Sequence, residues 1–200
     1  MNPKVEKHPL KPFLPHNAGL LMLGSFPPDK KRWSMDFFYP NFINDMWRIM
    51  GIVFFNDREH FILSGEKRFD IKAITEFCNG HGIAIYDTAS SIIRLKNNAS
   101  DNFLKIVERT DIRKILEQIP QCRAISATGE KAAVALSDIL DCKKPDMGGY
   151  VEFMQHEKPI RFYRMPSTSR AYPLAMNKKA AYYEEMFKYV FGNTATYKQP

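Results

Sequence analysis

Short apolar runs alternate with amphipathic segments along most of the chain. Runs typical of buried strands occupy residues 20–23, 83–87, 123–127, 150–154 and 160–165. Apolar positions at the three- and four-residue spacing of helices occupy residues 43–50, 71–78, 131–140 and 177–191. Strands that alternate with helices favour a mostly parallel sheet covered on both faces. The sequence therefore predicts an α/β fold, a three-layer α/β/α sandwich around a mostly parallel sheet of four to five strands.

The remaining stretches carry weaker patterns. Four prolines among residues 1–19 predict an extended arm with turns. Residues 88–98 are rich in serine, asparagine and basic side chains and predict a loop, whereas the apolar positions between Phe103 and Ile119 predict one or two helices. Residues 192–200 predict a disordered tail. We expect one domain over residues 1–200, which is long enough to bury a sizeable core.

Composition excludes several classes of protein. No apolar run approaches the ~20 residues that a membrane span needs, and the N-terminus lacks the apolar region of a secretory signal. We therefore expect a soluble, cytoplasmic protein with no membrane contact. Cys78, Cys122 and Cys142 are widely separated, which argues against a disulfide scaffold, a zinc site or an iron–sulfur cluster. The histidines show no metal-ligand spacing and receive no role; they are His8, His16, His60, His81 and His156.

The formal charge of +7 is compatible with a polyanionic partner and equally with scattered, solvated lysines. Basic residues gather in three predicted loops. They are Lys30, Lys31 and Arg32 in the first loop, Arg94 and Lys96 in the second, and Arg170, Lys178 and Lys179 in the third. On the predicted fold these loops share one face, which favours a nucleic acid as the partner.

Four unusual segments each follow directly on the end of a predicted strand. They are Gly24-Ser25-Phe26, Asp87-Thr88, Thr128-Gly129 and Pro166-Ser167-Thr168. Because the carboxyl ends of parallel strands lie along one edge of a sheet, we expect these segments to converge on one crevice. The aromatic-rich loop at residues 37–41 leads away from the first of them. This combination predicts a pocket that stacks and recognises a flat molecule.

These segments resemble the uracil-DNA glycosylase superfamily, and within it the branch of mismatch-specific uracil and hypoxanthine (deoxyinosine) DNA glycosylases. The resemblance spans about residues 10–189. It rests on LMLGSFP ending at Pro27, on Tyr39, Asn44 and Trp47, on Tyr86-Asp87, on the turn at residues 128–132 and on MPSTS at residues 165–169.

The resemblance implies a monofunctional DNA glycosylase of base excision repair, acting as a monomer without a metal or an organic cofactor. Such an enzyme flips a deaminated base, hypoxanthine or uracil, out of DNA and hydrolyses its N-glycosidic bond to leave an abasic site.

The catalytic candidates that follow are Asn44 and Asp87. A carboxamide accepts from water and donates to a base or sugar oxygen, and Asn44 matches the asparagine that carries catalysis in the hypoxanthine branch. The simpler alternative for Asn44 is a helix cap. Asp87 would hold water or tune a pocket group, or else bond local loop N–H groups. Phe26 occupies the position where the mismatch-specific enzymes carry a water-positioning Asn or Asp.

The resemblance also implies residues that bind the base and the DNA. Tyr39 matches the aromatic on which the flipped base stacks, unless it only packs in the core. The first loop would hold a base carbonyl by backbone N–H groups, and Thr128 would touch the base or sugar. The candidate base-binding residues are Gly24, Ser25, Phe26, Tyr39 and Thr128. The candidate DNA-binding residues are Ser167, Thr168, Ser169, Arg170, Tyr172 and Lys178, of which the Ser/Thr group has a helix cap as its alternative.

Two other functions remain open. The missing first-loop asparagine, and Met165 in place of the histidine of the classical uracil enzymes, are compatible with a nucleic-acid-binding relative that has lost catalysis. A glycosidase that acts on free nucleosides is the third possibility, and it predicts little dependence of binding on salt.

Overall fold

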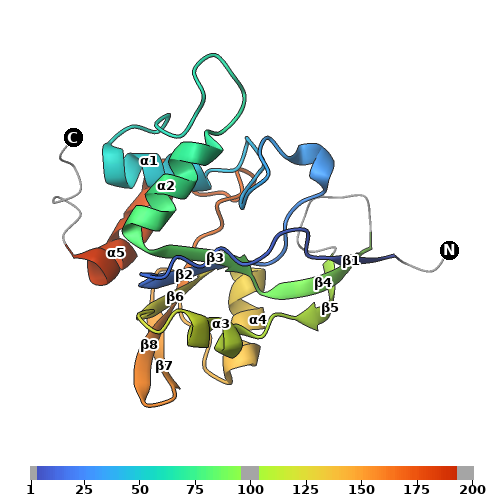
Figure 1. Ribbon diagram of the computed structural model, residues 1–200, viewed down its shortest axis with the longest axis vertical. Coiled ribbons are helices and arrows are strands. Elements are labelled where there is room, and N and C mark those ends of the chain that lie inside the picture. Colours follow the sequence, from blue (N-terminus) through green and yellow to red (C-terminus); the bar gives the residue numbers. More distant parts are fainter. Residues whose placement is uncertain (1–3, 96–103, 193–200) are drawn as a thin grey trace.

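The computed structural model describes residues 4–95 and 104–192, and its centre is a five-stranded sheet (Figure 1). The strands lie in the order β3–β2–β6–β8–β7. Their bounds are Ile83–Asp87 for β3, Leu20–Gly24 for β2, Ala124–Thr128 for β6, Lys158–Met165 for β8 and Tyr150–Gln155 for β7. The first four run parallel, and β7 pairs antiparallel with β8 as a hairpin. The predicted mostly parallel sheet is confirmed.

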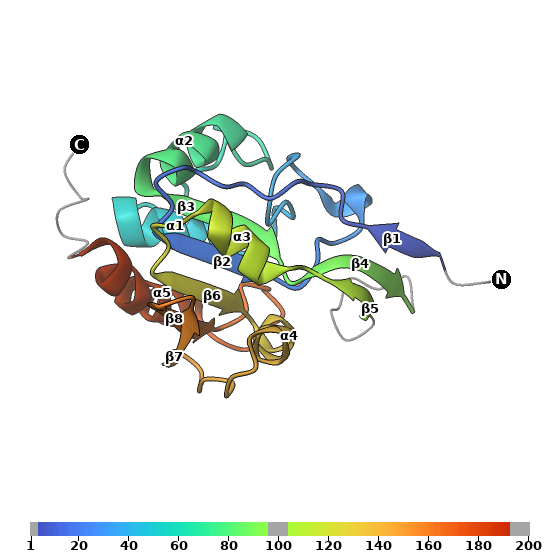
Figure 2. The ribbon, with the colours of Figure 1, turned by 60° about the horizontal axis from the view of Figure 1, so that its bottom comes forward.

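Helices cover both faces of this sheet. One face carries α1 (Met46–Phe55), α2 (Ile71–His81) and α5 (Met176–Phe191), and the other carries α3 (Ile112–Gln118) and α4 (Glu130–Leu140) (Figures 1 and 2). Every residue of β2 and β3 is buried between the two layers, which explains why their sequences are continuously apolar. The three-layer α/β/α architecture is therefore confirmed.

A second, three-stranded antiparallel sheet extends beyond the carboxyl end of β3 (Figure 2). It consists of β1 (Val5–Lys7), β4 (Ala89–Arg94) and β5 (Leu104–Arg109) in the order β1–β4–β5. The prediction of a loop at residues 88–98 is wrong for residues 89–94, which form β4. The prediction of a helix from Phe103 onward is wrong for residues 104–109, which form β5. Both strands bury only one face, on a small core of Phe26, Ala89, Ile92 and Leu104. Residues 96–103, including Lys96 and Phe103, lie outside the described residues.

The N-terminal arm crosses both sheets. It is extended as predicted, but it also contributes β1, which pairs with β4. Farther along, Phe13 exchanges two backbone hydrogen bonds with Ile85 of β3, at 3.0 and 2.9 Å. At the other end of the chain, the predicted tail falls almost wholly on residues 193–200, outside the described part. No helix in the described ranges combines the length and the apolar character needed to cross a membrane.

A short 3-10 helix, Lys30–Arg32, and a long irregular segment connect β2 to α1. α1 begins at Met46, three residues later than the helical pattern predicts, and Ile43 before it is half exposed. Arg48 fixes the segment before α1, since its Nη1 donates to the carbonyls of Phe42 and Asn44 at 2.6 and 3.1 Å. Burial lowers the pKa of this guanidinium. The loop that carries the candidate site is therefore tied to the helix behind it.

Candidate functional site

The carboxyl ends of the four parallel strands form one row. In register, Gly24 of β2 lies beside Asp87 of β3, and Thr128 of β6 lies beside Met165 of β8. Strands β2 and β6 are direct neighbours. The four segments that the sequence predicts to converge therefore follow adjacent strand ends along one edge of the sheet. Ligands of open α/β sheets bind outside this edge.

The first loop leaves two backbone donors at this row. Ser25 and Phe26 are buried, yet neither backbone N–H donates a hydrogen bond to another described residue. The Phe26 ring packs into the small core of the second sheet, and it contacts the ring of His8 in a T-shaped arrangement with 5.2 Å between centroids. The side chain of Phe26 thus joins the two sheets, while the backbone of the loop remains at the strand ends. Two neighbouring N–H donors of this kind are suited to bind a carbonyl oxygen.

Tyr39 reaches over the ends of β2 and β6. Its hydroxyl lies 3.0 Å from Oγ1 of Thr128, and its half-buried ring packs against Trp47 in a T-shaped arrangement with 6.3 Å between centroids. Trp47 in turn donates its indole N–H to the carbonyl of Phe38 at 3.0 Å. The aromatic loop is therefore anchored to α1, and two predicted base-binding residues from distant segments are in contact.

Asn44 lies immediately before Asp45, the N-cap residue of α1. Its Oδ1 accepts the backbone N–H of Met46, the first residue of the helix, at 2.9 Å, which is a structural role at the helix start like the one that the sequence leaves open. The side chain is half-buried, and its amide nitrogen donates to no described residue. The next residue, Asp45, donates its backbone N–H to the carbonyl of Thr168 at 2.9 Å. The PSTS turn thus lies directly against the start of α1.

A buried ion pair joins this turn to α1 and α5. Nζ of Lys179 lies 2.9 Å from Oδ2 of Asp45 and donates to the carbonyl of Ser169 at 2.8 Å. The side chains of Lys179 and Asp45 are only 1% and 4% exposed. The sequence analysis missed Asp45 and placed Lys179 among the loop cations, which is wrong because it belongs to the interior. Arg170, half exposed, has its Nε 3.5 Å from Oδ1 of Asp45.

The other predicted DNA-binding residues line the same turn. The hydroxyl oxygens of Ser167 and Ser169 accept backbone N–H groups two residues ahead, at 3.2 and 3.3 Å, which are turn-capping bonds. Thr168 is buried, Tyr172 is half-buried and Lys178 is exposed on α5. Of the predicted loop cations, Arg94 also turns inward, where it pairs with Glu6 at 3.0 Å and donates to the carbonyl of Pro27 at 2.8 Å.

Asp87 has a partner that sequence reasoning missed. Its Oδ2 lies 2.8 Å from Nε2 of His8, which comes from the arm 79 positions earlier. Burial and the charge of Asp87 raise the pKa of the Tyr86 hydroxyl next to this pair. Two residues so far apart share no local pattern, and only the path of the arm brings them together.

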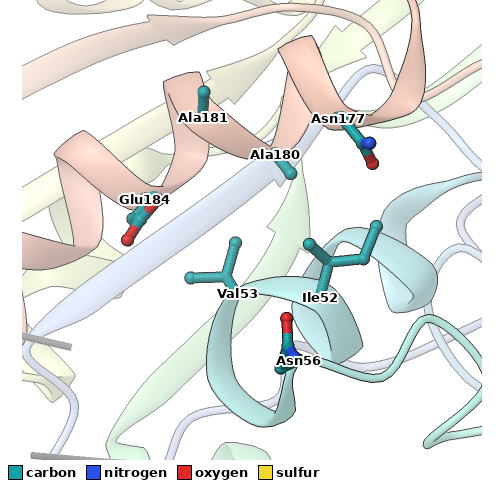
Figure 3. Close-up of a pocket in the computed structure, with 7 residues that line it drawn as sticks. All are labelled: Ile52, Val53, Asn56, Asn177, Ala180, Ala181 and Glu184. Atoms are coloured by element: carbon teal, nitrogen blue, oxygen red, sulfur yellow. The ribbon is translucent and has the colours of Figure 1, made fainter. Parts of the chain in front are cut away.

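Two cavities lie outside the row of strand ends. One, of about 190 Å³, lies between α1 and α5, with Val53 and Ala180 on facing helices (Figure 3). The other, of about 480 Å³, lies between the segment at residues 30–36 and the segment at residues 63–71. Neither is lined by Tyr39, Asn44 or another predicted site residue, so neither is the pocket that the sequence predicts. In the described part of the chain, no three His, Cys, Asp or Glu side chains are placed to hold a metal ion.

Neither a protein-family model nor a curated protein matches the sequence. Solved structures do match it. One is the NMR structure of a protein from Methanosarcina acetivorans described as a "putative Uracil DNA glycosylase". It superposes with a TM-score of 0.63 over 94% of this chain and 99% of that chain, at 18% sequence identity. At this identity the likeness shows a shared fold.

Proposed function

We propose that the protein is a DNA glycosylase that flips a deaminated base, hypoxanthine or uracil, out of DNA and hydrolyses its N-glycosidic bond. The observation that carries the proposal is the contact of Tyr39 with Thr128 above the strand ends. The aromatic side chain of Tyr39, the carboxyl group of Asp87 and the N–H groups of Ser25 and Phe26, which donate to no described residue, all belong to segments at the strand ends. The glycosylase-like fold and the motif resemblance support the same function.

In this proposal, the residues at the strand ends bind the base. A base stacked on the Tyr39 ring gains roughly 1–3 kcal/mol of binding free energy. The N–H groups of Ser25 and Phe26, which have no partner among the described residues, are suited to a base carbonyl, and Asp87 is suited to a ring N–H. Hypoxanthine and uracil each carry a carbonyl next to a ring N–H.

Asn44 is the first catalytic candidate. The bond from the Met46 N–H holds the plane of its carboxamide, and the amide nitrogen remains available to a water, the sugar or the base. Water adds to C1′, the glycosidic bond breaks with its electron pair on the departing base, and one proton of the water is released. Because the transition state resembles an oxocarbenium ion, fixed dipoles and the carboxylate of Asp87 would stabilise it. Capping and catalysis by Asn44 are therefore compatible.

The PSTS turn and its neighbours would hold the DNA backbone. Arg170 is half exposed beside the turn, and Lys178 is exposed at the start of α5. Arginine and lysine side chains contribute salt-sensitive contacts to phosphates. The hydroxyls of Ser167 and Ser169 accept turn bonds and still have hydrogens to donate to phosphate oxygens.

A panel of oligonucleotides tests the proposal. Uracil, hypoxanthine or xanthine is placed in single- and double-stranded DNA, and alkali-sensitive breaks report abasic sites after incubation with the protein. The expected result is breakage at one or more deaminated bases and none at undamaged bases. Loss of breakage in the Asn44→Ala variant excludes a contaminating glycosylase.

The second candidate is a nucleic-acid-binding relative without catalysis. It is favoured by the helix-cap bond of Asn44 and by Phe26, whose side chain lies in the core of the second sheet. Tight, salt-sensitive binding of the same oligonucleotides without any alkali-sensitive break would establish this candidate in place of the enzyme.

A further inference from the structure

His8 is enclosed at the edge of the candidate site. Its side chain is 2% exposed, and the rings of Phe26, Phe38 and Tyr86 surround it at centroid distances of 5.2, 6.1 and 4.6 Å. Nε2 lies 2.8 Å from Oδ2 of Asp87. An apolar enclosure of this kind leaves a polar ring few partners, so the ring is held in one orientation toward the carboxylate.

The contacts of the ring are compatible with a hydrogen bond that Nε2 donates to Asp87. Nδ1 lies 3.1 Å from the backbone nitrogen and 2.8 Å from the carbonyl oxygen of Leu10, so it can accept from the former or donate to the latter. In the neutral ring that accepts at Nδ1, and in the doubly protonated ring, Nε2 carries a hydrogen. In either form Nε2 donates to Oδ2 of Asp87.

The second oxygen of Asp87 faces the strand ends. A Cβ atom built on Gly24 would lie 2.3 Å from Oδ1 of Asp87 and 3.8 Å from the hydroxyl oxygen of Tyr39. Oδ1 therefore lies against the bare backbone of Gly24, at the end of β2. It accepts no hydrogen bond from another described residue, whereas Oδ2 is occupied by His8. The site thus presents a carboxyl oxygen that is available as a hydrogen-bond acceptor.

We propose that His8 is a positioning residue that aims Asp87 as a hydrogen-bond acceptor, so that the site distinguishes hypoxanthine and uracil from adenine and cytosine by their ring N–H. This inference rests on the proposed function and adds the means of selection to it. Hypoxanthine carries a hydrogen at N1 and uracil carries one at N3. Adenine and cytosine have a lone pair at those atoms, which a fixed carboxylate oxygen repels. Deamination itself therefore creates the group that Oδ1 accepts.

Equilibrium binding tests this selection without requiring turnover. Fluorescence anisotropy gives the ratio of dissociation constants for matched single-stranded oligonucleotides that carry one adenine or one hypoxanthine. We expect the wild-type protein to prefer hypoxanthine. His8→Leu should lower this preference about tenfold or more, the scale of a hydrogen bond to a charged group. His8→Gln keeps a donor and should retain most of it, and His16→Leu, an exposed histidine of the same arm, should leave it unchanged.

A second variant disturbs Oδ1 of Asp87 directly, without changing His8. In Gly24→Ala the added methyl group displaces Oδ1 while His8 stays intact, so the preference should fall as in His8→Leu. This variant carries the test if His8→Leu does not fold, as judged by thermal unfolding.

The outcomes separate this inference from the proposed function. A wild-type protein without preference for hypoxanthine overturns the inference, as does a preference that survives both His8→Leu and Gly24→Ala. Loss of preference in these variants with no base release by the wild-type protein supports the inference and refutes the enzyme. Base release by the wild-type protein with an unchanged preference in the variants supports the enzyme and overturns the inference.

Discussion

The hydroxyl of Tyr39 lies 3.0 Å from the hydroxyl of Thr128, 89 positions later in the chain. Tyr39 has a backbone φ of +51°, in the left-handed region that few residues other than glycine adopt. Such a conformation costs on the order of 1 kcal/mol or more and persists only where its surroundings hold it. The bond to Thr128 and the packing on Trp47 fix the ring above the strand ends.

Tyr39→Ala should weaken binding of lesion-containing DNA by roughly 1–3 kcal/mol, because it removes the face on which a base stacks. Tyr39→Phe loses the bond to Thr128 but keeps the face, so its dissociation constant should stay close to that of the wild-type protein. Anisotropy titrations with uracil and hypoxanthine oligonucleotides measure both. Equal losses in the two variants would assign the effect to the hydroxyl and contradict stacking.

Asn44→Ala should lower turnover by on the order of 100-fold or more, the effect of one transition-state hydrogen bond. The same change removes the cap on Met46 and should cost about 1 kcal/mol in the free energy of unfolding. Asn44→Asp separates the two effects, because it keeps the capping oxygen and removes the amide donor. We expect it to have wild-type stability and low turnover. Near-wild-type turnover in Asn44→Ala would move the catalytic role elsewhere, with Asp87 as the next candidate.

Arg170→Ala should raise the dissociation constant for DNA at low salt and flatten its dependence on salt, because one phosphate contact is lost. The rate of base release at saturating protein should be unchanged. Binding isotherms at several salt concentrations measure the slope. Lys158→Ala is the matched control, since this residue lies at the amino end of β8, on the opposite edge of the sheet. Equal slopes for the two variants would exclude Arg170 from the DNA contact.

Lys179→Met should destabilise the protein by roughly 3–5 kcal/mol, because it leaves the Asp45 carboxylate buried without its cation. The double variant Asp45→Asn with Lys179→Met removes both charges and should recover part of this loss. Urea unfolding followed by circular dichroism gives the free energies. A Lys179→Met variant as stable as the wild-type protein would mean that Arg170 replaces the missing charge.

The buried thiols predict a loss of stability in alkali. Burial raises the pKa of Cys122 from about 9 to about 12 and raises that of Cys78 as well. A raised pKa in the folded state means that the folded protein binds the proton more tightly than the unfolded chain does. The contribution is therefore complete below about pH 9 and declines as the pH rises toward 12. Urea unfolding between pH 8 and pH 10.5 should show this decline, and a smaller decline in Cys122→Ala.

The central sheet could be predicted because its strands are buried on both faces and are therefore continuously apolar. Strands β4 and β5 are buried on one face only, and their polar residues and distant partners hide them from local patterns. The strand ends at Gly24, Asp87 and Thr128 follow from the parallel topology, and they meet as expected.

The contacts that hold the site could not be predicted from spacing. Asp45 and Lys179 are 134 positions apart, and a lysine at the start of a helix ordinarily points to solvent. His8 lies among prolines in an arm without any periodic pattern. In both cases the partner of a charged group is decided by the packing of distant segments, which a single sequence does not encode locally.

The path of the arm affects how a recombinant version should be designed. A shortened gene that starts at Leu10 would still encode both bonds between Phe13 and Ile85 and all of the central sheet. It would lack His8 and β1, so Asp87 would lose the hydrogen bond that orients its carboxyl group. Such a product would give the circular dichroism spectrum of an intact fold and yet, by our inference, confuse adenine with hypoxanthine.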